Sequence, residues 1–306
     1  MERYYDLVII GAGPAGMSAA IYGSRAGLST LMLEMGAPGG KLIKTNEISN
    51  WPGIRSTSGA SLASEMFEHA TSFGAVYAYG EVVRIEDGEQ KQIICADGTA
   101  YMCKAVIVAT GTAERMLNIP GEEENVGRGV SYCAVCDGAF FKDRDVCVIG
   151  GGNAALEESL YLTQFARKVT IVIRRDVFRA EAHVQQQVEQ NERIAIIRRH
   201  VPKQILDDGN RVIGLVIEDV ESKETTTLPV AGVFPYVGAD PAVSFLNGLD
   251  ICDERGYLLV DEHNETKIKG IYGVGDVVAK PLRQVVTAAG DGANAAQHAF
   301  HAIKGI

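Results

Sequence analysis

The most regular pattern along this chain is an apolar run, a glycine-rich turn and a segment with helical spacing, and it occurs twice. In the first copy, residues 7–10 are apolar, residues 14–26 have helical spacing, and the apolar run at 31–33 leads into an acidic residue. Short apolar runs on both sides of a helical segment predict a β-α-β unit with parallel strands. A second copy repeats the architecture, but little of the sequence, at residues 147–149, 154–165 and 169–173.

Further apolar segments extend this alternation of strands and helices. Residues 105–109 and 271–276 each predict a strand that runs into a turn, and residues 211–218 predict another β segment. The Ala-rich residues 285–303 predict a helix. We therefore expect an α/β fold with two Rossmann-like nucleotide-binding domains of the three-layer ββα type.

Turn-forming residues at two places indicate where the chain crosses between these domains. One place is residues 118–121, followed by an acidic run at 122–124 that we expect to be a solvated face, and the other is residues 238–241. Because the two places bracket the second β-α-β unit, we expect one domain to be inserted into the other. The first domain would comprise residues 1–117 and 241–306, and the inserted domain residues 118–240.

Composition and charge exclude several classes of function. The formal net charge of −10 argues against a general nucleic-acid-binding protein, because affinity for phosphate backbones needs clustered Lys and Arg. No apolar run approaches the roughly 20 residues that span a bilayer. No secretory signal pattern precedes the first predicted strand. These features predict a cytoplasmic protein that binds neither membranes nor nucleic acids.

The turn of the first copy has the G-x-G-x-x-G spacing of a dinucleotide fingerprint, formed by Gly11, Gly13 and Gly16. Such glycines permit a tight turn, close approach of the backbone to a pyrophosphate, and close packing of helix against strand. The pyrophosphate is expected beside Pro14 and Ala15, where free N–H groups favour anions. After the next strand comes Glu34, whose carboxylate can bind ribose hydroxyls. This fingerprint alone does not distinguish FAD from NAD.

The second turn, Gly150-Gly151-Gly152-Asn153-Ala154-Ala155, is a G-x-G-x-x-A variant with alanine in the packing position. Where an NAD site would offer a carboxylate after the next strand, this chain has Arg174, Arg175 and Arg179. Arginine binds phosphate through paired, charge-assisted hydrogen bonds, which suits the 2′-phosphate of NADPH. The second site is therefore predicted to prefer NADPH to NADH.

Cys133 and Cys136 form a Cys-x-x-Cys motif shortly before the second turn. A zinc site would need two more ligands, usually another close pair, and the sequence has no second Cys-x-x-Cys. Two inert buried thiols are a second interpretation. We favour a redox-active disulfide and expect no metal, because the two-residue spacer lets the sulfurs meet in a small, readily opened ring. Asp137 follows directly and can donate or accept the protons that this chemistry needs.

These motifs together resemble low-molecular-weight bacterial thioredoxin reductases, in order and over nearly the whole chain. Residues 133–138 match the active-site motif of that family closely, and residues 39–53 resemble its flavin-covering segment. Residues 109–111 and 273–276 resemble two strand ends that its members place against FAD. The resemblance implies that FAD is bound by Gly11, Gly13, Pro14, Ala15, Gly16, Glu34, Gly39, Gly40, Lys41, Thr45, Asn50, Ala109, Thr110, Gly111, Gly275, Asp276, Arg283, Gln284 and Val285.

Two positions depart from the family pattern. Lys41 stands where the family usually has Gln, which we expect to change flavin contacts without loss of FAD. Ile173 stands where the family has His before its arginine pair, which affects the expected affinity for NADPH more than the preference for it.

Arg283 and Gln284 are similar to the pair that the family places near the isoalloxazine ring, where a positive charge favours the reduced form of the flavin.

The resemblance also implies a mechanism and a partner. NADPH reduces FAD, and reduced FAD reduces the Cys133–Cys136 disulfide, with Cys136 nearer the flavin. Cys133 then attacks the disulfide of thioredoxin or a thioredoxin-like protein, and Cys136 resolves the mixed disulfide. The family alternates between two domain orientations, with hinges expected near Pro120 and Ala239, and it forms homodimers. Phe140 and Phe141 match the family's aromatic docking surface, although core packing explains them almost equally well.

Three other functions compete with this hypothesis. A flavin thioredoxin reductase that takes electrons from ferredoxin should have a degraded second nucleotide turn, whereas the glycines and arginines here are intact. A ferredoxin–NADP reductase of related architecture would not need the Cys-x-x-Cys motif. A redox sensor that binds the cofactor would carry FAD but would not reduce a thioredoxin over many turnovers.

Overall fold

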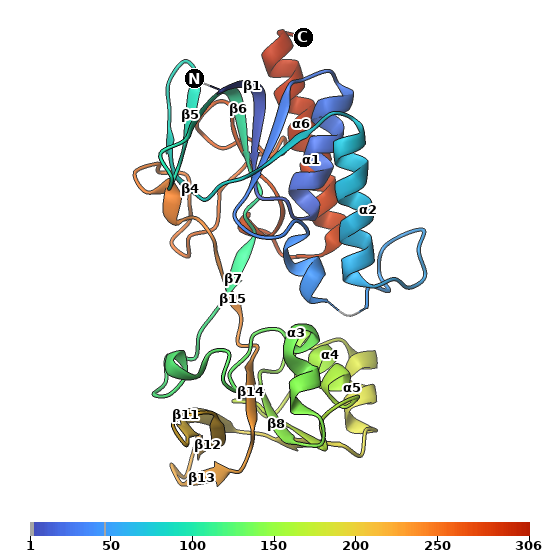
Figure 1. Cartoon of the computed structure of the whole chain (residues 1–306), viewed down its shortest axis with the longest axis vertical. Helices are drawn as coiled ribbons and strands as arrows, with labels where there is room; N and C mark the ends of the chain where they lie inside the picture. The colour runs from blue at the N-terminus through green and yellow to red at the C-terminus, as the bar shows by residue number, and fades with distance from the viewer. Residues whose placement is uncertain (1–2, 46) are drawn as a thin grey trace. The chain divides into compact units, whose positions relative to one another are not determined.

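The computed structural model describes residues 3–45 and 47–306, which divide into two compact units (Figure 1). Unit 1 combines the chain up to Ala113 with Asp240–Ile306, and unit 2 is the continuous segment Glu114–Ala239. One unit is thus inserted into the other, but the first boundary precedes the predicted one. Residues 118–121 lie inside unit 2, where the carbonyl of Pro120 accepts a hydrogen bond from the Ile205 amide at 2.9 Å.

Unit 1 is built on a mixed sheet whose strands are β1 (Arg3–Ile10), β2 (Thr30–Glu34), β3 (Val76–Tyr79), β4 (Val82–Glu86), β5 (Lys91–Cys95), β6 (Ala100–Val108) and β16 (Ile271–Gly273). The strand order is β3-β2-β1-β6-β5-β4, and β16 pairs with the second half of β6. Strands β3, β2, β1, β6 and β16 run parallel to one another, whereas β5 pairs antiparallel with β6. Their carboxyl ends therefore meet at one edge, where open α/β sheets bind their ligands.

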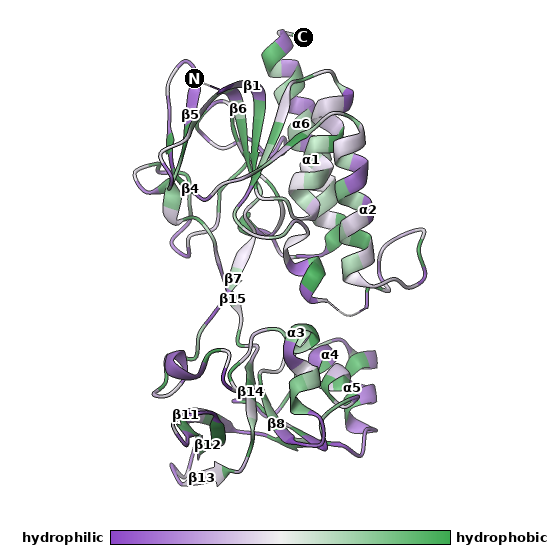
Figure 2. Cartoon of the chain, viewed as in Figure 1, coloured by the Kyte–Doolittle hydropathy of each residue, from purple (hydrophilic) through white to green (hydrophobic). Residues whose placement is uncertain are grey.

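Helices α1 (Pro14–Arg25), α2 (Gly59–Ser72) and α6 (Val285–Lys304) cover one face of this sheet (Figure 1). Alternate residues of β1 serve two cores, because Leu7 and Ile9 face the helices while Val8 and Ile10 face the opposite side. The carboxyl-terminal halves of β1 and β6 are accordingly hydrophobic, whereas β1 begins with polar residues (Figure 2). Helices α1 and α6 touch closely, and a Cβ at Gly292 would lie 2.1 Å from the Ala15 carbonyl oxygen.

Unit 2 has three layers. Its parallel sheet has the order β10-β9-β8-β14, and its antiparallel sheet has the order β11-β12-β13. One core joins the helices to the parallel sheet, and a second core joins the two sheets. The elements are β8 (Asp145–Ile149), β9 (Lys168–Val172), β10 (Ile194–Ile197), β11 (His200–Asp207), β12 (Val212–Asp219), β13 (Thr225–Leu228), β14 (Gly232–Pro235), α3 (Ala134–Asp137), α4 (Asn153–Leu162) and α5 (Ala182–Glu189). The predicted α/β fold with a ββα layering is confirmed.

The two chain crossings pair with each other as β7 (Thr112–Glu114) and β15 (Ala239–Pro241).

The acidic run at residues 122–124 is only partly a solvated face, which corrects the prediction. Glu122 is buried, and its carboxylate accepts hydrogen bonds from the amides of Leu117 and Asn118 and from the Tyr132 hydroxyl, all at 2.7–2.8 Å. Glu122 therefore organises the first residues of unit 2, while its two acidic neighbours are exposed.

The predicted β-α-β units agree with the structure to within a few residues. Sequence patterning did not predict α2, the β4–β5 pair or α5, whose segments are mixed in polarity. No helix in the described part of the chain is both long and apolar enough to cross a bilayer.

Candidate redox and nucleotide-binding sites

In the glycine turn after β1, close packing requires glycine at two of the three positions. A Cβ at Gly11, where φ is +105°, would lie 2.4 Å from the Ala109 oxygen, and one at Gly16 would lie 1.9 Å from the Gly11 oxygen. A Cβ at Gly13 would meet no heavy atom within 4 Å. The first and third glycines thus allow close packing, and the second faces open space at the start of α1, where a pyrophosphate fits.

Glu34, at the end of β2, fixes the adjacent turn. Its Oε2 accepts a hydrogen bond from the Ala12 amide at 2.9 Å, and its Oε1 accepts one from the Gly36 amide at 2.8 Å. Each carboxylate oxygen retains acceptor capacity for a second donor. The geometry fits the predicted binding of ribose hydroxyls.

The 3₁₀ turn η1 (Gly40–Lys44) brings the predicted flavin-covering residues to this edge. The Gly39 amide donates to the Ala12 oxygen at 2.8 Å, and a Cβ at Gly40 would lie 3.3 Å from the Gly13 Cα. Lys41 donates through Nζ to the Thr112 hydroxyl at 2.6 Å, and the Thr45 hydroxyl donates to the Lys41 carbonyl at 2.9 Å. Lys41 is thus tied to the segment that follows β6.

Residues from three distant parts of the sequence complete this edge. Asn50 donates to the Gln284 side chain at 3.0 Å, and Val285 begins α6. Directly after β6 come Ala109, Thr110 and Gly111, and the Thr110 hydroxyl donates to the Ala242 carbonyl at 2.8 Å. The turn η5 (Gly275–Val277) follows β16 and contains Asp276. All the residues predicted to bind FAD therefore belong to unit 1.

Arg283 makes its contacts with the backbone of its own segment and with one aromatic ring. Its Nε donates to the Asp276 carbonyl at 3.2 Å, and its Nη2 donates to the Val278 carbonyl at 3.1 Å. The guanidinium carbon lies 4.3 Å from the centre of the Tyr257 ring. Arg283 therefore holds the backbone around Asp276, in addition to any charge that it places near a flavin.

The second glycine turn, after β8, repeats the design of the first in unit 2. A Cβ at Gly150 would lie 2.2 Å from the Tyr236 oxygen, whereas one at Gly152 would meet nothing within 4 Å. Ala155 is buried against Gly150, as the packing position requires. The backbone again leaves open space at the start of a helix, here α4, which also contains Asn153 and Ala154.

A cavity of about 430 Å³ lies beside this turn, entirely within unit 2. Gly150 and Gly151 line it together with Arg174, Arg175 and Arg179. No Asp or Glu is among its lining residues. In the described part of the chain, none of these three arginines forms an ion pair, although the chain as a whole carries a net charge of −10. The cavity is therefore suited to a strongly anionic ligand.

Cys133 and Cys136 are joined by a disulfide, with their Cα atoms 5.3 Å apart. Cys133 caps α3, and its sulfur accepts a hydrogen bond from the Cys136 amide at 3.1 Å. Cys133 is buried, whereas Cys136 is exposed. The Asp137 carboxylate accepts a hydrogen bond from the Ser131 hydroxyl at 2.6 Å, and that hydroxyl oxygen accepts one from the Cys133 amide at 3.1 Å. The Asp137 carboxylate is thus linked through Ser131 to the backbone amide of Cys133.

Two further titratable groups lie behind the dithiol. The Tyr236 hydroxyl accepts a hydrogen bond from the Ala134 amide at 3.1 Å, and Tyr236 also lines the cavity. Burial raises the pKa of Tyr236 well above its usual range, and the Glu158 carboxylate adds to the rise. Burial also raises the pKa of Glu158 to about 8, with a further contribution from Glu157. One Glu158 oxygen is buried without a hydrogen-bond partner.

Comparison with known proteins shows the family of the chain. Residues 5–292 match the family model described as pyridine nucleotide-disulphide oxidoreductase. The chain belongs to the pyridine nucleotide-disulphide oxidoreductase family. Members of this family bind a flavin and a pyridine nucleotide, and its thioredoxin reductases use FAD and NADPH. Both glycine turns of this chain, with their open second positions, fit that pair of cofactors.

Within the family, the chain is similar to bacterial thioredoxin reductases. It is 46% identical to a thioredoxin reductase of Bacillus subtilis over 99% of this chain and 96% of the relative. The crystal structure of Lactococcus lactis thioredoxin reductase has a TM-score of 0.96 and 47% identity, and it covers 99% of this chain and 100% of that one. A ferredoxin-flavin thioredoxin reductase from Clostridium acetobutylicum matches less well, with 29% identity and a TM-score of 0.55 over the full length of both chains.

Some residues that line the cavity of unit 2 could not be predicted from a sequence motif. Arg115, His200 and Tyr236 reach the cavity from three separate segments, and no motif connects them. The pairing of β8 with β9 and β14, together with the start of β11, brings them together only in the folded chain.

The two predicted docking aromatics separate in the structure. Phe140 is 76% exposed, whereas Phe141 is buried with its ring centre 5.2 Å from that of Phe234. Phe141 therefore belongs to the core of unit 2, which corrects its assignment to a docking surface.

Proposed function

We propose that this protein is a thioredoxin reductase that transfers electrons from NADPH, through FAD and the Cys133–Cys136 pair, to thioredoxin or a thioredoxin-like protein. One observation carries the proposal. The disulfide lies in the same unit as a nucleotide cavity lined by arginines and free of carboxylates. The identity of 46% to a thioredoxin reductase over 99% of the chain supports the same activity.

The cofactor sites divide between the units. We assign FAD to the edge of unit 1, with Gly13 against the pyrophosphate and Glu34 and Asp276 toward hydroxyl groups. Bound there, FAD supplies two-electron chemistry that can connect a pyridine nucleotide to a disulfide. In unit 2, Gly152 would meet the pyrophosphate of NADPH, and Arg174, Arg175 and Arg179 would bind its 2′-phosphate. These arginines reach the cavity without competing carboxylates, which favours NADPH over NADH.

The dithiol carries the electrons to the partner. Two electrons and two protons convert the Cys133–Cys136 disulfide to two thiols. In the attack on thioredoxin, the Cys133 thiolate forms a new S–S bond as the partner's disulfide breaks. Cys136 then displaces the second thiol of the partner and restores the original disulfide. We assign the handling of protons during these exchanges to Asp137, because it directly follows Cys136 in the sequence.

The partner, assembly and location complete the proposal. Phe140 offers an exposed apolar ring four residues after Cys136 for thioredoxin docking. From the family resemblance we also propose a homodimer in the cytoplasm. Sedimentation of the purified protein would test whether it is a dimer. A separate test of docking is Phe140→Ala, which should raise the KM for thioredoxin without changing the rate of flavin reduction.

Anaerobic mixing with pyridine nucleotides tests the electron donor. NADPH should bleach the flavin absorbance rapidly, and NADH should do so far more slowly. A yellow protein that NADPH leaves oxidised, but that reduced ferredoxin bleaches, would replace the proposal with the ferredoxin-dependent activity. A protein that is colourless even after reconstitution with FAD would contradict both.

Single-cysteine variants test the roles of the two sulfurs. In Cys136→Ser, NADPH should still reduce the flavin, thioredoxin turnover should be lost, and a mixed disulfide between Cys133 and thioredoxin should accumulate. Cys133→Ser should form no such adduct. Because Cys136 is the more exposed residue, the opposite trapping pattern would exchange the two roles while leaving the overall activity in place.

A further inference from the structure

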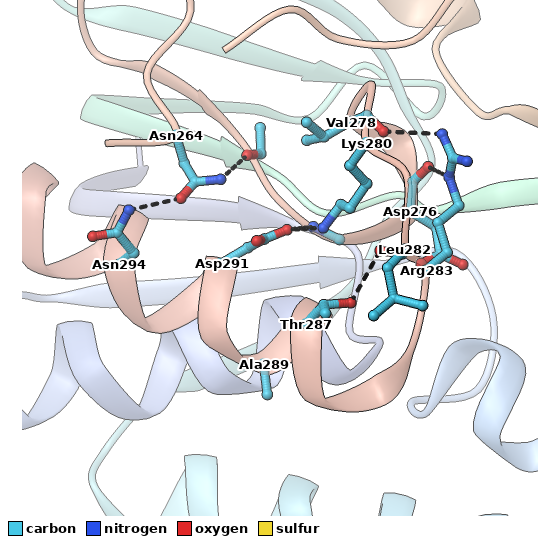
Figure 3. Close-up of polar contacts among 12 residues, drawn as sticks. Asn264, Asp276, Val278, Lys280, Leu282, Arg283, Thr287, Ala289, Asp291 and Asn294 are labelled. Carbon is cyan, nitrogen blue, oxygen red and sulfur yellow. Dashed lines mark hydrogen bonds and ion pairs between the residues drawn. The ribbon is translucent and has the colours of Figure 1, made fainter. Parts of the chain in front are cut away.

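One face of α6 carries polar side chains that contact the segment between β16 and the start of the helix (Figure 3). Thr287, Asp291 and Asn294 occur at positions i, i+4 and i+7 of an otherwise Ala-rich helix, so they lie on one side. On the opposite side, buried alanines pack into the unit 1 core. The polar face is therefore turned toward the end of β16 and the η5 turn.

Asp291 is the central residue of this face. Its Oδ2 accepts a hydrogen bond from the Gly275 amide at 2.9 Å and also binds Nζ of Lys280 (Figure 3). The two side chains are only 22% and 14% exposed, respectively. A charged pair that is largely removed from water interacts more strongly than one on the surface. Asp291 thus fixes the amide at which the η5 turn begins.

Neighbouring contacts hold the same segment on either side. Asn294 donates to the Asn264 side-chain oxygen at 2.9 Å, and Asn264 donates to the Gly273 carbonyl at 3.2 Å. The Thr287 hydroxyl accepts a hydrogen bond from the Gln284 amide at 3.1 Å. The path of the chain from the end of β16 to α6 is therefore set from the helix.

Gly275 leaves this turn little freedom. Its φ is +75°, and a Cβ there would lie 2.9 Å from the Ala15 Cβ on α1. Asp276 comes next, and its carboxylate makes no hydrogen bond or ion pair to any described residue, while its carbonyl accepts from Arg283. A small rotation about Gly275 would redirect the Asp276 carboxylate. The side chain predicted to meet FAD thus depends on a backbone position that Asp291 controls.

We propose that Asp291 and Lys280 are positioning residues for FAD. Asp291 holds the Gly275 amide, Lys280 holds the Asp291 carboxylate, and the turn fixed in this way aims the Asp276 carboxylate at the cofactor. The inference rests on the proposed function, because it assumes that unit 1 binds FAD. It adds one residue that contacts the turn, Asp291, and one that holds this residue in place, Lys280. Neither belongs to the fingerprint motifs.

Substitution of either partner should weaken FAD binding. Asp291→Asn leaves an oxygen for the Gly275 amide but removes the charge that holds Lys280, and Lys280→Met keeps the side-chain length and removes the cation. Loss of a hydrogen bond to a charged group at a partly buried site should weaken FAD binding by at least about tenfold. Lys280→Arg retains the charge and should restore most of the affinity. Titration of the apoprotein with FAD, followed by flavin fluorescence, measures the dissociation constant.

The matched control is Asp250→Asn, which breaks an ion pair with Lys267 on the surface of the same unit, where the two side chains are 92% and 60% exposed. It should change the FAD dissociation constant by less than about twofold. Hydrogen exchange of the full-length holoprotein provides a second measurement. Amides of the Gly275–Val277 turn should exchange faster in Asp291→Asn and at the wild-type rate in the control.

The possible outcomes separate the two proposals. Wild-type protein that binds no FAD would contradict the proposed function. If the wild type binds FAD but Asp291→Asn and Lys280→Met bind it equally well, the positioning role is wrong. It is also wrong if the variants lose thermal stability without losing affinity. Should Asp291→Asn fail to fold, the affinities of Lys280→Met and Lys280→Arg decide the question.

Discussion

The two glycine turns of this protein have the same backbone design but opposite charge at the end of the following strand. In both, the first glycine packs against a neighbouring backbone and the second faces open space. In unit 1, the next strand ends at Glu34, whose two oxygens already hold backbone amides. In unit 2, three arginines without carboxylate partners reach a cavity. The glycine turn therefore provides a place for a pyrophosphate, and the strand end determines which nucleotide is preferred.

Substitution of the third glycine of the first turn, Gly16, should have the largest effect on stability and cofactor content. Gly16→Ala would place a Cβ 1.9 Å from the Gly11 oxygen, so backbone must move. We expect a loss of about 3 kcal/mol or more in the free energy of unfolding. The protein should then be purified without flavin. Flavin content and the thermal unfolding midpoint measure both effects.

The reverse change in unit 2 is the control. Ala155→Gly removes a methyl group from a position that already accommodates one, and it should cost about 1 kcal/mol. The KM for NADPH should stay within a factor of about three, and FAD should remain bound. Equal damage from the two substitutions would mean that the packing positions of the two turns are not comparable.

Sequence patterning identified the buried strands and the glycine turns, because in these parts of the fold the physical role of a position restricts which residue types can occupy it. The apolar strands 7–10 and 147–149 and their glycine turns were found because burial on both faces and tight turns restrict composition strongly. The pattern could not place Glu122, because an acidic run is usually solvated, whereas tertiary contacts supply three donors to this carboxylate. The same limit applies to Phe141, since an aromatic near a dithiol fits a core and a docking surface equally well.

The arginines at the second strand end should give the next largest effect. Arg174→Gln combined with Arg175→Gln removes two of the three guanidinium groups that we assign to the 2′-phosphate of NADPH. The KM for NADPH should rise about 10- to 100-fold, while kcat/KM for NADH should change little. Steady-state rates with both nucleotides and a thioredoxin provide the measurement.

Arg167→Gln is the matched control for charge. Arg167 belongs to the same unit but pairs with Asp145 and does not line the cavity. It should leave the ratio of NADPH to NADH activity unchanged. If the double variant keeps its preference for NADPH, other lining residues such as Arg115 or His200 must provide the selectivity.

The binding site was predictable to the extent that it follows local motifs. Cys133 and Cys136 form one short motif and the six residues from Gly150 to Ala155 form another, and the spacing within each motif indicates its chemistry. Tyr236, His200 and Asp291 reach the candidate sites through contacts between distant segments, and each is an ordinary residue in its local sequence. Their roles depend on strand order and helix packing, which a single sequence does not specify.

The units also differ in how their acidic side chains are accommodated, and this difference makes the stability of the protein depend on pH. Glu34 is held by amide donors, whereas Glu158 has a buried oxygen without a partner and a pKa of about 8, against 4.5 for an ordinary glutamate. In the folded protein Glu158 therefore keeps its proton between these two pH values, while in the unfolded chain it ionises. Since the folded state binds more protons in this range, Glu158 lowers stability progressively as the pH rises from 4.5 to 8.

Glu158→Gln removes this dependence. Its free energy of unfolding relative to wild type should increase from about pH 4.5 to about pH 8 and then level off, reaching on the order of a few kcal/mol. Calorimetric unfolding of the holoprotein at several pH values across this range measures the difference. Glu192→Gln, which changes an exposed carboxylate of the same unit, should show no such trend. A constant difference between Glu158→Gln and wild type across the range would mean that Glu158 is already ionised in the folded protein, and that the region behind the dithiol is hydrated well enough to stabilise the charge.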